Sequence, residues 1–256
     1  MGAVAYTPQR QLLLIHGAWA GSWVWDTIRP EFEALGFASH AIDLPGNGSD
    51  NTPADAVDLQ RYLDYLCDYV LSIPGNFTVV AHSGAGVIAT ALAERMPERV
   101  DAVVFIAGMM LPSGMGFGDL IGRLLPDHPE VSGINPYLLW SDDHNSSRVP
   151  VIAARDIFFN DLDDQTAIAA AQKLSAQPEG GKVLVAQWTQ ERAGSVPRLY
   201  LEALQDKSVV LVLQRAMQEL VPGASVVSLD AGHAPQVSMP HRVAAEIDQF
   251  LRTQVQ

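Results

Sequence analysis

A serine among small residues stands where an apolar run gives way to a helical pattern. The segment Ala81-His82-Ser83-Gly84-Ala85-Gly86 follows the apolar run FTVV and precedes the helical pattern VIATALAERM. A nucleophilic serine at a sharp strand-to-helix turn requires this context, because the turn lifts the hydroxyl above the sheet. The usual pattern there is G-x-S-x-G, and this chain has the small residues Ala81 and Ala85 at the two glycine positions. We therefore predict that Ser83 is a catalytic nucleophile.

A serine hydroxyl needs a base to take its proton, and the base needs a carboxylate to orient it. His233 lies in the segment DAGHAP, directly after the last apolar run. Asp206 follows the apolar run before that one, at the carboxyl end of a predicted strand. Asp230 is the alternative acid, but it lies only three residues before His233, which is a poor spacing for reaching Nδ1. We predict Ser83 as nucleophile, His233 as base and Asp206 as the orienting acid.

Backbone N–H groups are expected to stabilise the negative charge that develops on a carbonyl oxygen under attack. Gly84 directly follows the predicted nucleophile, at the N-terminus of a predicted helix. The second donor should come from the loop after the first predicted strand, which reads His16-Gly17-Ala18-Trp19. By position, we predict that the N–H groups of Ala18 and Gly84 form an oxyanion hole.

Large apolar side chains are expected to line the substrate pocket. The first loop, the end of the fourth predicted strand and the chain beyond it supply Trp19, Met109, Met110, Phe158, Phe159 and Trp188. Core packing would explain each of them equally well. A pocket of aromatic and methionine side chains favours hydrophobic or aromatic substrates over charged ones. We expect no metal and no cofactor, because the sequence has no phosphate-binding glycine motif, no H-E-x-x-H and no Cys/His cluster.

A parallel sheet is expected to position these residues. Several short runs are apolar throughout rather than alternating, as strands buried on both faces are. The predicted strands span 11–15, 38–43, 77–82, 100–106, 198–204 and 224–229. Helical patterns lie between them at 24–36, 56–72, 84–95, 208–220 and 241–253. This alternation predicts an α/β fold with a mostly parallel, doubly wound sheet.

The stretch 111–190 interrupts the alternation of strands and helices. It is rich in proline and glycine, and a structureless loop of that length is uncommon in a compact domain. We expect an inserted cap subdomain there, with a helix over 163–176 that begins at two aspartates. The predicted core is therefore made of residues 1–110 and 191–256, and the predicted cap of residues 111–190.

Composition excludes several classes of function. The chain has 256 residues, of which 48% are hydrophobic, so that it can bury a sizeable core. Its 16 Lys and Arg against 29 Asp and Glu give a net charge of −13, which opposes binding to nucleic acid or to an anionic membrane. The single cysteine, Cys67, excludes an internal disulfide. With no membrane-spanning run and no signal-peptide core, we expect a cytoplasmic protein that acts on a small-molecule substrate.

Together these motifs resemble the α/β-hydrolase superfamily, and within it the plant methylesterase and hydroxynitrile-lyase family and its bacterial relatives. The segment HGAWAGSW at 16–23 is similar to the family's opening motif, and ERAGSVPRLY at 191–200 is similar to its E-R-x-G-S-V-x-R-x-Y stretch. Gln205-Asp206-Lys207 matches the segment that carries the family's acid. The resemblance implies an α/β-hydrolase fold with six strands and a cap at about 111–190, and it supports Asp206.

Several positions depart from the family patterns. Hydroxynitrile lyases of the family have Thr after the first-loop His and Lys after the catalytic His, where this chain has Gly17 and Ala234. Their absence argues against cyanohydrin cleavage. Plant methylesterases usually have G-H-S-x-G and D-H-M, where this chain has Ala81 and Gly232-His233-Ala234. Their methylated-hormone substrates are therefore not carried over. The family often dimerises through its cap, so a homodimer is one expectation.

The combined prediction is a serine hydrolase that cleaves a small hydrophobic or aromatic carboxylic ester through an acyl-enzyme. Amides, carbamates and lactones are cleaved by the same machinery and remain alternatives. A non-hydrolytic lyase or a ligand receptor on the same fold is the third alternative, because a fold does not fix a function.

Overall fold

Six parallel strands form the central sheet of the protein. The computed structural model describes residues 10–255. The strands lie in the order β2-β1-β3-β4-β8-β9, and every neighbouring pair is parallel. Their bounds are β1 Gln11–Ile15, β2 Ala38–Ile42, β3 Phe77–His82, β4 Val100–Ile106, β8 Arg198–Ala203 and β9 Ser225–Leu229. All six predicted strands are confirmed to within one residue at either end.

The central strands are buried on both faces, which explains why their sequences are apolar throughout. In β1, Leu13 and Ile15 pack on one face of the sheet, whereas Leu12 and Leu14 pack on the other. The same division runs through β3 and β4. Because strand side chains alternate between faces, a strand with helices on both sides needs apolar residues at every position.

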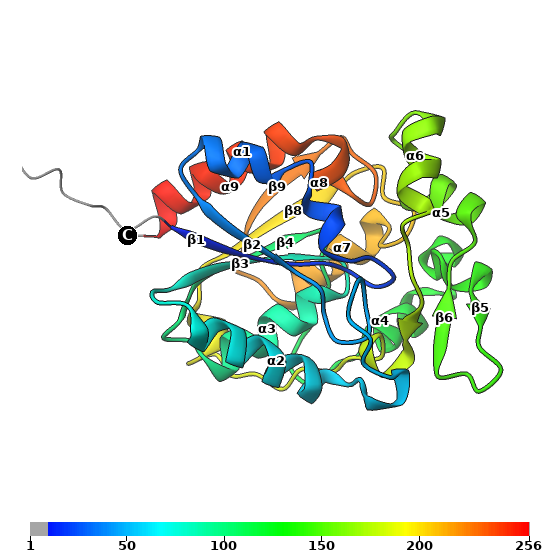
Figure 1. Cartoon of the computed structure of the whole chain (residues 1–256), viewed down its shortest axis with the longest axis horizontal. Coiled ribbons are helices and arrows are strands. Elements are labelled where there is room, and N and C mark those ends of the chain that lie inside the picture. The colour runs from blue at the N-terminus through cyan, green and yellow to red at the C-terminus, as the bar shows by residue number, and fades with distance from the viewer. Residues whose placement is uncertain (1–9, 256) are drawn as a thin grey trace, which may run out of the picture.

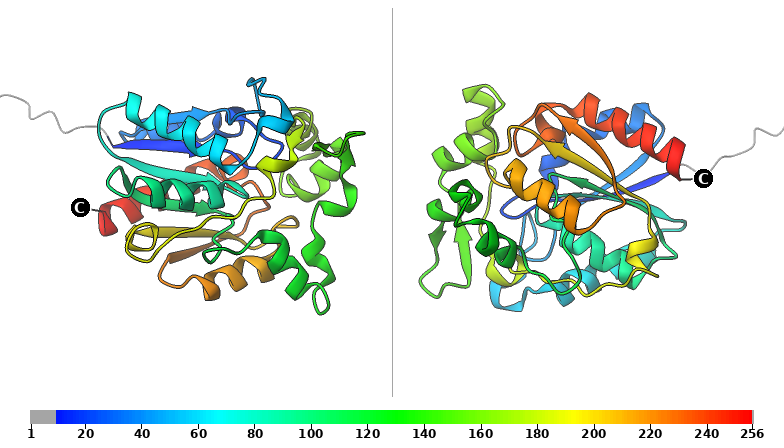
Figure 2. Two further views of the ribbon diagram at one scale, coloured as in Figure 1. Left: turned by 90° about the horizontal axis from the view of Figure 1, so that it is seen from below. Right: turned by 180° about the vertical axis from the view of Figure 1, so that it is seen from behind.

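Helices cover both faces of the sheet (Figure 1). One face carries α2 Leu59–Ser72, α3 Ala85–Arg95 and α7 Leu211–Leu220. The other carries α1 Arg29–Ala34, α8 Pro235–Ser238 and α9 Pro240–Gln254. Figure 2 shows the same layers from below and from behind. Short 3-10 helices lie in the connections at η1 Ser22–Trp25, η2 Ala54–Ala56 and η6 Ala193–Ser195.

Two predicted helices differ substantially from the structure, and the helices predicted to begin at 56 and 208 begin three residues later, at Leu59 and Leu211. The segment 24–36 is not one helix, because η1 ends at Trp25 and α1 begins only at Arg29. Pro30 lacks an N–H and its ring crowds the carbonyl four residues earlier, so a helix can hold it only in its first turn, as α1 does. The helix predicted over 163–176 spans only Asp164–Ala171. The chain beyond it extends toward the first loop, where the Ser175 N–H donates to the Trp19 carbonyl at 2.8 Å.

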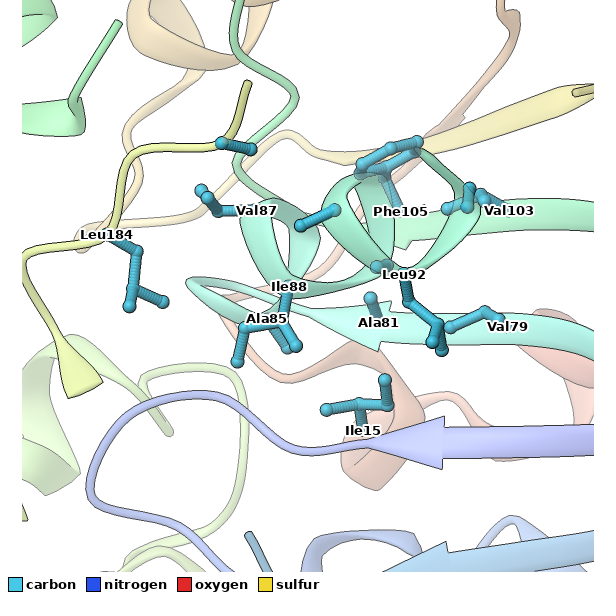
Figure 3. Packing of buried hydrophobic residues seen from close by; sticks show 14 of the residues in the cluster. Ile15, Val79, Ala81, Ala85, Val87, Ile88, Leu92, Val103, Phe105 and Leu184 are labelled. Atoms are coloured by element: carbon cyan, nitrogen blue, oxygen red, sulfur yellow. The ribbon is translucent and has the colours of Figure 1, made fainter. Parts of the chain in front are cut away.

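Helix α3 packs directly on the strand that precedes it (Figure 3). Leu92 of α3 lies beside Val79 and near Ala81 of β3, in the same buried cluster. Leu184, which follows β7 in the chain, lies beside the first turn of α3 near Ile88. Packing on β3 therefore fixes the position of α3.

The chain between β4 and β8 forms a separate layer at one end of the sheet (Figure 1). Its helices are α4 Phe117–Leu124, η3 Pro129–Ser132, η4 Asn135–Tyr137, α5 Val151–Ile157, α6 Asp164–Ala171 and η5 Glu179–Gly181. A small antiparallel sheet is made of β5 Leu139–Trp140, β6 Ser146–Arg148 and β7 Gln177–Pro178. We call residues 111–190 the inserted segment. Its apolar cluster also contains Trp19 of the first loop. Among the helices of residues 10–255, none combines the length and apolar character that a membrane span requires.

The tight contact between α3 and the chain after β4 predicts different effects for two glycines. A Cβ on Gly86 would lie 2.7 Å from the Met109 carbonyl oxygen, whereas a Cβ on Gly122 of α4 meets nothing within 4 Å. We expect Gly86→Ala to lower the free energy of unfolding by about 1–3 kcal/mol, because backbone must move. Gly122→Ala should raise it by up to about 1 kcal/mol, since alanine favours a helix interior. Urea unfolding of both variants measures this, and a Gly86→Ala protein as stable as wild type would contradict the packing.

Candidate active site

Ser83 lies at the turn between β3 and α3 in a left-handed backbone conformation. Its φ is +55°, which costs a non-glycine residue roughly 1–2 kcal/mol. Three hydrogen bonds hold the residue there. The Ser83 N–H donates to the Ile106 carbonyl at 3.1 Å, and the Ser83 carbonyl accepts the N–H groups of Met109 at 2.9 Å and Gly86 at 3.1 Å. The strand neighbours and the helix start therefore fix the serine in this geometry.

The structure brings the three predicted catalytic side chains into one hydrogen-bond chain. The distance from Ser83 Oγ to His233 Nε2 is 3.1 Å, and from His233 Nδ1 to Asp206 Oδ2 it is 2.8 Å. All three residues are buried. Because a carboxylate only accepts, His233 donates its Nδ1–H to Asp206, which leaves Nε2 free to accept the serine proton.

Asp206 is itself held rigidly. Its other carboxylate oxygen accepts the N–H groups of Ser208 at 2.7 Å and Val209 at 3.0 Å. The buried Gln214 closes the base of the same loop, because it bonds both to Ala203 and to the Val209 carbonyl.

Asp230, the alternative acid, lies elsewhere. It is exposed and accepts a hydrogen bond from Gln205 Nε2. The spacing argument against it therefore agrees with the positions of the two aspartates.

The residues that carry the two predicted oxyanion donors line the same cavity as Ser83. Ala18, Gly84 and Ser83 all line it. Neither the Ala18 N–H nor the Gly84 N–H donates a hydrogen bond to any group in residues 10–255. The N–H of the next residue, Trp19, instead donates to Gln177 Oε1 at 3.0 Å. Both predicted donors thus remain available to a bound oxygen.

This cavity has a volume of about 400 Å³. Its walls are mostly apolar and come from the core and from the inserted segment: Trp19, Leu44, Ile88, Met109, Phe117, Ile121, Ile134, Leu184 and Val209. Of the predicted lining residues, Trp19 and Met109 lie here. A second, smaller cavity of about 20 Å³ adjoins His233 and is lined by Phe158 and Phe159.

Two of the predicted lining residues lie elsewhere. Met110 and Trp188 line a small separate cavity in the core. Met110 is the next residue after Met109, yet it packs in the core cluster instead of lining the cavity beside Ser83. The Trp188 indole N–H donates to the Leu111 carbonyl at 3.0 Å, which ties that ring to the start of the inserted segment.

Two buried histidines support the loops around Ser83. His82 donates its Nε2–H to the His233 carbonyl at 2.8 Å. His16 donates its Nδ1–H to the Gly17 carbonyl and accepts the Leu44 N–H at Nε2. Burial lowers the pKa of the His82 imidazole to about 3, with a smaller contribution from the nearby His233 ring. Burial also lowers the pKa of His16. Both rings are therefore neutral at neutral pH.

Sequence reasoning missed a group of polar residues in the inserted segment. Asn160 Nδ2 donates to the Gln205 carbonyl at 3.1 Å, directly before Asp206. Asp161 accepts the N–H of Gly232 at 2.7 Å, directly before His233. The only sequence feature that points to this contact is Gly232, because a Cβ there would lie 2.6 Å from an oxygen of Asn160 and of Asp161. Gln177, which holds the first loop, carries no such signal.

Within residues 10–255, no group of three or more His, Cys, Asp or Glu is arranged to hold a metal ion. The expectation that no metal and no cofactor is needed stays a prediction.

Comparisons with known proteins place this chain among enzymes of one family. Residues 12–246 match the sequence profile described as "Alpha/beta hydrolase family". The chain is 30% identical to a pyrethroid hydrolase of Sphingobium wenxiniae, over 93% of this chain and 86% of that protein. It is 27% identical to methylesterase 17 of Arabidopsis thaliana, over 89% of this chain and 86% of that protein. The solved structure of a pyrethroid hydrolase from Sphingobium faniae matches with a TM-score of 0.83 and 27% identity, over 96% of this chain and 98% of that one.

The buried His82 predicts a pH dependence of stability. Its pKa is about 3 in the folded protein and about 6.5 in an unfolded chain. The unfolded chain therefore binds one more proton between these values, and stability falls as the pH falls. The slope for this one group reaches about 1.4 kcal/mol per pH unit. We expect His82→Gln to show a shallower loss of stability than wild type between pH 6.5 and 4.5 in urea unfolding.

The exposed His241 provides the control. His241→Gln should follow the wild-type slope. Equal slopes for wild type and His82→Gln would contradict a neutral, buried His82.

Proposed function

The chain belongs to the alpha/beta hydrolase family, and from that premise we propose that it is a serine esterase acting on small hydrophobic or aromatic carboxylic esters. The observation that carries this proposal is the continuous hydrogen-bond chain from Ser83 through His233 to Asp206, with distances of 3.1 and 2.8 Å. The names of the relatives, a pyrethroid hydrolase and a methylesterase, support the same class of reaction.

In the first half of the reaction, Ser83 becomes acylated. Its Oγ attacks the ester carbonyl carbon while its proton passes to His233 Nε2. Asp206 accepts the Nδ1–H and stabilises the positive charge that forms on the imidazole. The carbonyl oxygen becomes an oxyanion, which the N–H groups of Ala18 and Gly84 bind. The bond to the alcohol then breaks, and His233 gives its proton to the departing alcohol oxygen.

In the second half, a water molecule takes the place of the alcohol. His233 removes a proton from this water as its oxygen attacks the acyl carbon. The same two N–H groups stabilise the second oxyanion. The bond to Ser83 Oγ breaks, His233 returns the proton to Oγ, and the carboxylic acid leaves.

The cavity supports a hydrophobic substrate. Its lining includes Leu44 and Ile88 of the core and Phe117, Ile121 and Leu184 of the inserted segment. Each apolar contact with such walls removes substrate surface from water, at about 25 cal/mol per Å². Residues 111–190 thus act as the cap of the site. The cationic Lys182 at its edge is already paired with Glu179 at 2.8 Å, so it offers no free charge for an anionic substrate.

The first loop argues against the lyase alternative. Gly17 stands where the hydroxynitrile lyases of the family have Thr, and a Cβ on Gly17 would lie 2.9 Å from Ser83 Cβ. A larger side chain does not fit in this backbone geometry. The threonine hydroxyl that the hydroxynitrile lyases have is therefore absent from this chain, and Ser83 leaves no space for a side chain at Gly17.

A panel of p-nitrophenyl acyl esters and aryl methyl esters tests the proposal. We expect wild-type turnover, with apolar acyl groups preferred, and none above background for Ser83→Ala. Asp206→Asn should lower kcat by about 10⁴-fold, because asparagine does not stabilise the imidazolium and favours the wrong tautomer.

Asp230→Asn is the matched control, since Asp230 was the alternative acid. It should retain activity close to wild type. Activity that persists in Asp206→Asn but disappears in Asp230→Asn would overturn the assignment. A wild-type protein that hydrolyses no ester of the panel would overturn the esterase proposal itself.

A further inference from the structure

The residue next to Ala18 is bound by the inserted segment at every polar group it has. The Trp19 N–H donates to Gln177 Oε1 at 3.0 Å, and its carbonyl accepts the Ser175 N–H at 2.8 Å. Its indole N–H donates to Ser147 Oγ at 3.2 Å. Trp19 is buried, so these three contacts replace water entirely. The first loop therefore takes its shape from the inserted segment rather than from the sheet alone.

Gln177 is the centre of this arrangement. Its side chain is 1% exposed and uses all of its hydrogen-bonding capacity. Oε1 accepts from the Trp19 N–H and from Asn47 Nδ2, at 3.0 and 2.9 Å. Nε2 donates to the Pro178 carbonyl at 3.1 Å and to Tyr62 Oη at 3.3 Å. A backbone N–H at one end and a backbone carbonyl at the other allow only one orientation of the amide.

The backbone at this point needs such support. Trp19 has a φ of +61°, a conformation that costs a non-glycine residue roughly 1–2 kcal/mol and persists only when its surroundings enforce it. The Trp19 N–H belongs to the peptide that Ala18 shares with Trp19. Holding this N–H on Gln177 Oε1 fixes the plane of that peptide, which is joined through the Ala18 Cα to the peptide that carries the Ala18 N–H. It also occupies the Trp19 N–H, whereas the N–H of Ala18, which lines the cavity, has no acceptor within residues 10–255.

We propose that Gln177 is a positioning residue for the oxyanion hole, acting through the Trp19 peptide on the Ala18 N–H. This inference rests on the proposed function, because it needs Ala18 to bind an oxyanion. It means that the inserted segment does more than cover the site. One of the two groups that stabilise the transition state is aligned by a side chain of β7, about 160 residues further along the chain.

The test compares Gln177→Met with Ser147→Ala. Gln177→Met has nearly the same volume but cannot accept the Trp19 N–H. We expect kcat to fall about 10- to 100-fold, less than for complete loss of an oxyanion donor, with KM little changed. Ser147→Ala breaks a hydrogen bond between the same two parts of the chain, but through the indole. Since Ser147 does not line the cavity, kcat and KM should stay near wild type.

An alkyl trifluoromethyl ketone provides a readout that general loosening of the fold would not produce. Such a ketone adds to a nucleophilic serine and forms a tetrahedral oxyanion. Its inhibition constant should rise in Gln177→Met by the same factor as kcat/KM falls, because both depend on the oxyanion hole. Inhibition should be unchanged in Ser147→Ala. If Gln177→Met does not fold, Gln177→Asn makes the same comparison, because its shorter side chain does not reach Trp19.

The outcomes separate the two proposals. If wild type hydrolyses esters but kcat and ketone inhibition in Gln177→Met equal those of wild type, the positioning role is wrong and the esterase proposal stands. A rise in KM alone would also overturn the positioning role. If wild type neither hydrolyses esters nor binds the ketone, the esterase proposal fails and the role of Gln177 fails with it.

Discussion

The left-handed backbone of Ser83 is the constraint on which the rest of the site depends. A φ of +55° lifts the hydroxyl out of the sheet, and three backbone hydrogen bonds, to β4, to the chain after β4 and to α3, hold it there. The same turn brings α3 so close to the chain after β4 that Gly86 has no space for a side chain. His233 and Asp206 lie in loops that follow strands of the same parallel sheet. Because the carboxyl ends of parallel strands lie at one edge, both side chains come close to Ser83.

The site is completed from two parts of the chain. Ser83, Asp206 and His233 follow strands of the sheet. The inserted segment forms hydrogen bonds to the first loop and to the backbone just before Asp206 and His233. Gln177 holds the first loop, and Asn160 and Asp161 bind the residues that precede Asp206 and His233. The contact of Gln177 with Trp19 is buried, and an unpaired buried amide is costly. Opening the inserted segment would therefore disturb the geometry of the site as well as expose it.

The sequence predicts the sheet well, and it also predicts three side chains that the structure brings together. Buried parallel strands must be apolar at every position, and loops at their carboxyl ends carry the polar exceptions. The sequence predicts less of the structure where residues far apart in the chain make the contact, or where local steric effects determine the conformation. Pro30 divides a segment whose periodicity alone suggests one helix. Met109 and Met110 are equivalent in type, yet only Met109 lines the cavity. Gln177 lies 158 residues after Trp19 in the chain, so no local pattern marks their contact.

The central claim is that Ser83 is a nucleophile activated by His233. Treating wild type and His233→Ala with a fluorophosphonate, followed by peptide mass spectrometry, tests it most directly. We expect one phosphonylated residue, Ser83, and much slower labelling in His233→Ala, because a serine hydroxyl without its base reacts poorly. Modification at another residue, or the same rate in both proteins, would contradict the claim.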